Sequence, residues 1–105
     1  PICGDGTAQS VREAVLASAV LTGIAAGGDR AALLGHYQAM LIAAMRRHLL
    51  LCAQFYADGG RGEWWRTQHE ALMQGHRWCT GLLAKLPEPQ YALHGLRLVP
   101  RRVAA

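Results

Sequence analysis

Charged side chains are scarce in this chain of 105 residues. They make up 17% of the sequence, whereas hydrophobic residues make up 51%. A typical soluble domain has about a quarter of its residues charged, so we expect much of this surface to be hidden in a core or against a partner. The length leaves room for one domain. We therefore expect residues 1–105 to form a single helical domain.

The sequence also lacks a disulfide framework and a long apolar run, and we expect no secretory leader. Cys3, Cys52 and Cys79 are an odd number of cysteines at wide spacing, which favours a reducing, cytoplasmic setting. No basic start followed by an apolar run opens the chain. The uncharged stretch 14–28 is shorter than the roughly 20 strongly apolar residues that span a bilayer. We expect a buried helix there and no membrane partner.

Basic residues are not concentrated anywhere along the chain. They outnumber acidic residues by 11 to 7, which gives a net charge of +4, but no basic run exceeds two residues. A nucleic-acid surface gathers Lys and Arg on one face or along one helix. We therefore expect no nucleic-acid partner.

Periodicity and helix-breaking residues predict three helices. Asp29 is a good N-cap for the second helix, which carries an apolar stripe at steps of three and four residues. The expected ranges are about 7–26, 30–57 and 62–86, ended by Gly27-Gly28, Asp58-Gly59-Gly60 and Pro87. The stripe comprises Leu33, Tyr37, Met40, Ala44, His48, Leu51 and Phe55.

The short connection at residues 59–62 predicts that the second and third helices are antiparallel. After Pro87, the alternation in Leu96-Arg97-Leu98 predicts a short edge strand or an extended tail that docks on the helices. The predicted fold class is mainly α, with three helices, two of them long and antiparallel, and a short C-terminal extended segment.

The opening of the chain, residues 1–6, leads directly into the first helix. Glycines before a helix let the backbone approach a ligand closely, and the free N–H groups of the first turn attract negative charge. Pro1, Gly4 and Gly6 follow a Pro-x-x-Gly-x-Gly spacing, and an Ala/Leu-rich helix comes next. This arrangement resembles a flavin-contacting motif of aromatic hydroxylases, flavin-dependent halogenases and geranylgeranyl reductases.

The resemblance implies a role for FAD. In such a protein Pro1, Gly4, Asp5, Gly6 and Thr7 would contribute to the flavin site. The amides of residues 5–8 would face the pyrimidine edge of the ring, where reduction places negative charge. The dipole of the helix would favour the reduced anion by about 0.3–2 kcal/mol.

The sequence departs from that family in what precedes the motif. The dinucleotide fingerprint Gly-x-Gly-x-x-Gly is absent, as is the Gly-Asp pair expected before Pro1, so these residues hold no pyrophosphate site. The resemblance therefore implies a C-terminal segment of a monooxygenase or halogenase-like oxidoreductase. It would bind FAD only with the remainder of the parent flavoprotein, would be inactive alone, and its catalytic residues stay unknown. The alternative is a non-catalytic, homo-oligomerising helical interaction module.

Histidine and cysteine side chains raise a third hypothesis. On antiparallel helices His48, Cys52, His76 and Cys79 could meet as a tetrahedral zinc set. However, the sequence has no Cys-x-x-Cys pair, and histidines on a mixed seam are usually core residues. We therefore predict no metal site.

Tryptophans and the first cysteine each have a functional and a packing interpretation. Trp64, Trp65 and Trp78 suit a substrate or partner surface, but they also suit simple helix packing. Trp64 and Trp65 point about 100° apart on a helix, so at least one is expected to be exposed. Cys3 precedes a helix start, where a thiol can be reactive, although a buried small side chain is the simpler reading.

Overall fold

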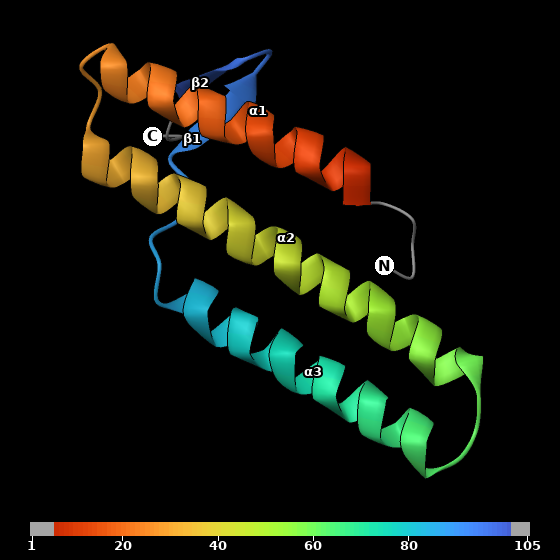
Figure 1. Ribbon diagram of the computed structural model, residues 1–105. Coiled ribbons are helices and arrows are strands. Elements are labelled where there is room, and N and C mark those ends of the chain that lie inside the picture. The colour runs from red at the N-terminus through yellow and green to blue at the C-terminus, as the bar shows by residue number, and fades with distance from the viewer. Residues whose placement is uncertain (1–5, 102–105) are drawn as a thin grey trace. The chain divides into compact units, whose positions relative to one another are not determined.

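The computed structural model describes residues 6–101, which form three helices and a two-stranded hairpin. The elements are α1 (Gly6–Ala25), α2 (Arg30–Gly59), α3 (Glu63–Ala84), β1 (Tyr91–His94) and β2 (Arg97–Pro100) (Figure 1). This architecture confirms the mainly α fold class. None of the helices within the described residues has the length and hydropathy needed to cross a bilayer.

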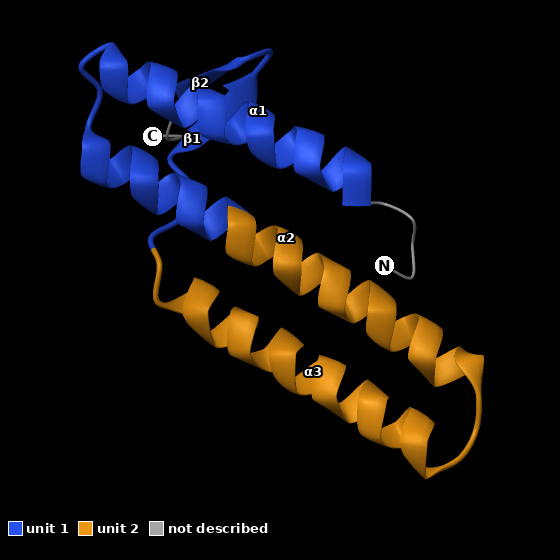
Figure 2. Ribbon diagram, in the orientation of Figure 1, with its two compact units in different colours: residues 1, 3–40, 87–105 blue, residues 2, 41–86 orange. Residues whose placement is uncertain are grey.

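Two compact units make up the described chain (Figure 2). Unit 1 contains residues 6–40 and 87–101, and unit 2 contains residues 41–86, so α2 contributes to both. The expectation of a single domain stays a prediction.

Local capping sets where α2 and α3 begin and end. The Oδ1 atom of Asp29 accepts a hydrogen bond from the Ala32 amide at 3.2 Å, which confirms Asp29 as the N-cap of α2. At the end of α3 the Lys85 amide donates to the Leu82 carbonyl, two residues before Pro87. All helix ends lie within two residues of the expected positions because these signals are local.

Removal of the Asp29 cap tests this assignment. Asp29→Ala is expected to lower the free energy of unfolding by about 1 kcal/mol, because the amides of the first turn of α2 lose an acceptor. Asp58→Ala is the matched control, since Asp58 lies in the last turn of α2, where a carboxylate faces the negative end of the helix dipole. Urea unfolding followed by circular dichroism measures both variants. Equal losses would contradict a capping role.

In unit 1, α1 and the start of α2 meet around Leu33. This side chain is 3% exposed, and a Cβ built at Gly23 of α1 would lie 3.1 Å from its Cδ1 atom. The absence of a side chain at Gly23 thus lets Leu33 fill the space between the two helices. Ala19 and Val20 of α1 are buried as well.

The C-terminal extended segment is a hairpin that packs on α1 through β2. Tyr91 pairs with Pro100 and His94 with Arg97, which leaves a two-residue turn at Gly95-Leu96. Gly95 has a φ of 61°, whereas no described residue other than glycine has a positive φ. Glycine at the first central position is the pattern of a type II′ turn. The sequence had suggested only one strand, and the strand at 91–94 was missed.

In unit 2 the C-terminal part of α2 packs against α3. Contacting positions rise along α2 as they fall along α3, which confirms the antiparallel prediction. The pairs are Arg46 with Thr80 (Nε to Oγ1, 2.7 Å), Leu49 with Gly75, and Tyr56 with Trp65 (ring centroids 5.6 Å apart). Cys52, Ala53 and Cys79 are buried in this unit.

Candidate functional site

The start of α1 is the candidate site that the sequence predicted. Of the five predicted residues, Gly6 and Thr7 belong to the first turn of α1. Pro1, Gly4 and Asp5 lie outside the described residues, as does Cys3. Gly6 and Thr7 are both exposed, and among the described residues no side chain lies within 4 Å of a Cβ built at Gly6. The helix therefore begins where the glycine motif places it, with open space beside its first residue.

Electrostatics at this helix start favour an anion. The first turn contains no acidic side chain that would offset the positive end of the helix dipole. The Ser10 hydroxyl donates to the Gly6 carbonyl at 2.9 Å, so it occupies an acceptor of the turn and leaves the amide donors alone. The space beside Gly6 and the polarity of the turn are compatible with an electron-rich ring edge. A bound flavin would supply the redox chemistry, since Gly6 and Thr7 themselves carry no group suited to it.

Large apolar side chains lie on the surface of unit 1. Leu21 on α1 is 66% exposed and Leu96 in the hairpin turn is 70% exposed. The exposed large hydrophobic residues of this unit are Val11, Leu21, Leu34, Leu93, Leu96 and Val99. The residues buried in the same unit are Ala19, Val20, Leu33, His36 and Ala39. In unit 1, therefore, more large apolar side chains are exposed than buried, and the exposed ones remain available to a partner.

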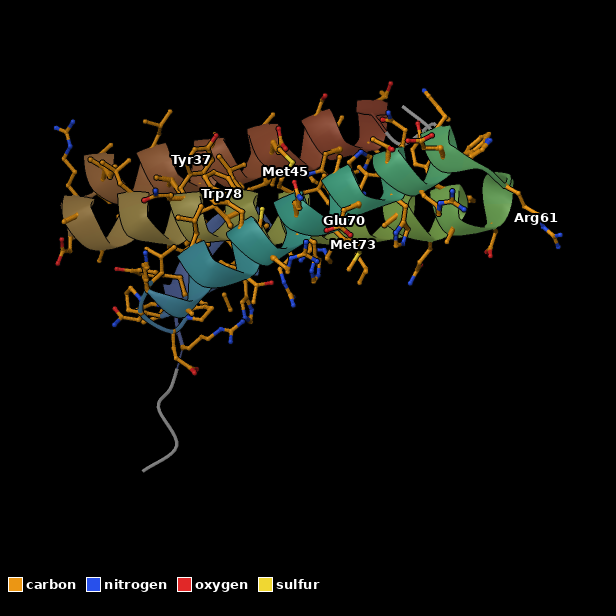
Figure 3. All side chains as sticks on the ribbon, turned by 90° about the horizontal axis from the view of Figure 1, so that it is seen from below. Tyr37, Met45, Arg61, Glu70, Met73 and Trp78 are labelled. Atoms are coloured by element: carbon orange, nitrogen blue, oxygen red, sulfur yellow. The ribbon has the colours of Figure 1, made fainter. Side chains whose placement is uncertain are left out.

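In unit 2, too, large apolar side chains are exposed, while the buried residues Cys52, Ala53 and Cys79 are small. Its exposed large hydrophobic residues are Met45, Leu50, Leu51, Phe55, Trp64 and Trp78. Met45 and Trp78, labelled in Figure 3, come from α2 and α3 respectively. Trp78 is 67% exposed, whereas its neighbour Cys79 is 1% exposed. Isolated exposed apolar residues are ordinary, but several on two adjacent helices are typical of an interaction surface.

An aromatic cluster lies at the turn between α2 and α3. The rings of Trp64 and Trp65 meet edge to face with centroids 4.9 Å apart, and Tyr56 contacts both. Trp65 is half-buried against the turn glycines Gly59 and Gly60, while Trp64 is exposed. The expectation that at least one of the two adjacent tryptophans is exposed is confirmed. Trp65 is a packing residue, and Trp64 is available for contact.

The proposed zinc ligands do not assemble. His48 Nε2 lies 3.5 Å from Cys52 Sγ, one helical turn away. His76 Nε2 is buried without a hydrogen-bond partner, and Cys79 is buried as a free thiol. Among residues 6–101 no group of three or more His, Cys, Asp and Glu side chains could hold a metal ion.

His36 is a buried residue that the sequence did not single out. It is 7% exposed, its ring lies edge-on to Tyr91 at 5.5 Å, and its Nδ1 atom has no hydrogen-bond partner. Burial, and to a smaller extent the cation of Arg101, lowers the pKa of His36 below the ordinary 6.5. The helical stripe follows Leu33 with Tyr37, four residues on, and so passes over His36, which also lies about one turn from Leu33.

Comparisons of the chain with protein families, with curated proteins and with solved structures find no match.

Proposed function

We propose that this chain is the C-terminal helical segment of a flavin-dependent oxidoreductase of the monooxygenase or halogenase type. In this proposal the start of α1 contributes to the FAD site, and other polypeptide supplies the adenine and pyrophosphate sites. The segment has no activity alone, and the predicted setting is cytoplasmic. The observation that carries the proposal is the exposed first turn of α1, with open space at Gly6, the last residue of the Pro-x-x-Gly-x-Gly motif.

Two properties of the described residues support this assignment. The first turn of α1 lacks acidic side chains, so its amides and dipole suit the negative charge of a reduced flavin. Exposed side chains such as Leu21 and Trp78 suit a segment whose apolar faces pack against the remainder of a parent protein. The chemistry of the flavin would come from the cofactor, while Gly6 and Thr7 would bind and polarise it.

The experiment begins with the coding region ahead of Pro1. The proposal expects it to encode a strand followed by Gly-x-Gly-x-x-Gly. The longer product is purified, and its visible spectrum is recorded beside that of residues 1–105 with added FAD. We expect a bound-flavin spectrum for the longer product only. A coding region without the fingerprint, or a longer product without flavin, contradicts the proposal.

A second candidate function is a homo-oligomerising interaction module. The exposed Phe55, Trp64 and Trp78 of unit 2 favour it, because aromatic residues contribute strongly at the centres of interfaces. This candidate function requires no cofactor, so it does not depend on a flavin-binding remainder of the protein.

Self-association distinguishes the second candidate from the first. Trp78→Gln is expected to raise the dimer dissociation constant about thirtyfold, since an interfacial tryptophan contributes about 2 kcal/mol or more. Arg77→Gln is the adjacent control, because the exposed ion pair of Arg77 with Glu70 contributes little. Sedimentation equilibrium measures both variants. A well-folded wild-type chain that stays monomeric at high concentration contradicts this candidate.

A further inference from the structure

His36 is the one polar side chain buried among the described residues. It lies on the part of α2 that belongs to unit 1, and Tyr91 of β1 covers it with a ring contact at an interplanar angle of 76°. Its Nδ1 atom is enclosed without a hydrogen-bond partner. A neutral imidazole tolerates this position, whereas an imidazolium would be buried with an unsatisfied N–H.

The charged group that acts on His36 is a cation, Arg101, so it offers an imidazolium no compensation. From the hairpin side Tyr91 and Arg101 face His36, and Arg101 is a cation held in place by its bond from Nε to the Tyr91 carbonyl at 3.2 Å. The α2 residues one turn away on either side are uncharged. On α1 the described charged residues are Arg12 and Glu13, each of which hydrogen-bonds Gln9.

We propose that the C-terminal hairpin is a pH-sensitive latch on unit 1, in which protonation of His36 releases residues 91–101 from α2. The hairpin is suited to this role because it is short and the ring contact of Tyr91 with His36 joins it to α2, while β2 packs on α1. When the hairpin leaves, the imidazolium of His36 gains water and moves away from the guanidinium of Arg101. Both changes favour the released state in acid.

The sign of the effect follows from proton linkage. Burial and Arg101 lower the pKa of His36 in the docked state, so the released state binds more protons below the ordinary value of 6.5. The hairpin therefore docks most tightly at a pH above 6.5, and its docking weakens as the pH falls below 6.5. Between about pH 7.5 and about pH 5.5 the ratio of docked to released hairpin falls by as much as about tenfold.

Backbone amide exchange of the whole chain, followed by NMR and corrected for intrinsic exchange rates, tests the latch. For the wild type we expect protection of the hydrogen-bonded hairpin amides of Ala92 and Val99 to fall severalfold on acidification, while α3 amides keep theirs. His36→Phe is expected to remove this dependence, and His36→Gln serves if the larger ring disturbs packing. His94→Gln removes an exposed histidine of β1, and this variant is expected to retain the pH dependence of hairpin protection.

Three outcomes overturn the proposal. The first is hairpin protection that does not change with pH. The second is a loss of α3 protection in parallel with the hairpin, which would mean general unfolding. The third is an unchanged pH dependence in both His36 variants.

Discussion

Leu33→Ala is expected to lower the free energy of unfolding by about 2–5 kcal/mol. Leu33 is the largest hydrophobic side chain in the core of unit 1, and its methyl groups fill the space that Gly23 leaves open. Gly28 also approaches it, since a Cβ built there would lie 3.0 Å from Leu33 Cδ1. Alanine would leave a cavity between α1 and α2, where few other large side chains are available to refill it.

The adjacent leucine provides the control for this change. Leu34 is 43% exposed, so Leu34→Ala removes the same atoms from the same helix without opening a cavity. Its expected loss is below about 1 kcal/mol. Urea unfolding of both variants, followed by circular dichroism, gives the comparison. Equal losses would mean that the contact of α1 with α2 at Leu33 is not formed as described.

Gly60→Ala is expected to destabilise unit 2 by about 1–3 kcal/mol. A Cβ at this position would overlap the indole of Trp65, with 2.5 Å to Cε2 and 2.8 Å to Cδ1. The ring is held by Tyr56 and Trp64, so it cannot move without breaking the aromatic cluster. Thermal unfolding measures the loss, and a shift in tryptophan fluorescence is expected to accompany it.

The same substitution at Gly81 is expected to have the opposite sign. Gly81 lies within α3 and is exposed. Among the described residues, no side chain lies within 4 Å of a Cβ built at this position. Gly81→Ala should therefore stabilise the helix by about 0.5–1 kcal/mol, because alanine restricts the unfolded chain. Similar effects at Gly60 and Gly81 would contradict the close packing of Trp65 on the turn.

Helix positions could be predicted from the sequence because their signals are local. The Asp29 cap, the Gly27-Gly28 break and Pro87 act on the residues beside them, and the structure places the helix ends there. The antiparallel contact of α2 with α3 followed from the short turn between them. These features depend little on distant parts of the chain.

Burial could not be predicted in the same way. The apolar stripe contains Leu33, which is buried, and Phe55, which is exposed. In addition, α2 buries His36, Ala39 and Ala53, which lie outside the stripe. Helices that approach closely accept small residues at the contact, as Gly75 does beside Leu49, and larger side chains are displaced to the surface. The pattern of residue size in the sequence does not reveal which face another helix will cover.

The hairpin and the ligand of the candidate site are two further features that the residues alone did not predict. β1 is four residues long and does not alternate in burial, so its strand character depends on pairing with β2 through the Gly95 turn. The start of α1 was located from its glycines, and the structure places Gly6 and Thr7 in its first turn. The assignment of that turn to flavin comes from the resemblance, because neither Gly6 nor Thr7 has a side chain that is specific for one class of ligand.

The reduction potential of bound flavin tests the proposed function most directly. In the longer flavin-binding product, Gly6→Asp would place a carboxylate at the start of α1, and Gly81→Asp adds the same charge in the middle of α3, where the site is also open. The proposal predicts that Gly6→Asp lowers the potential by roughly 5–45 mV, which corresponds to about 0.3–2 kcal/mol for a two-electron couple. Gly81→Asp should leave it unchanged. Equal potentials in both variants and the wild type would contradict a flavin at this helix start.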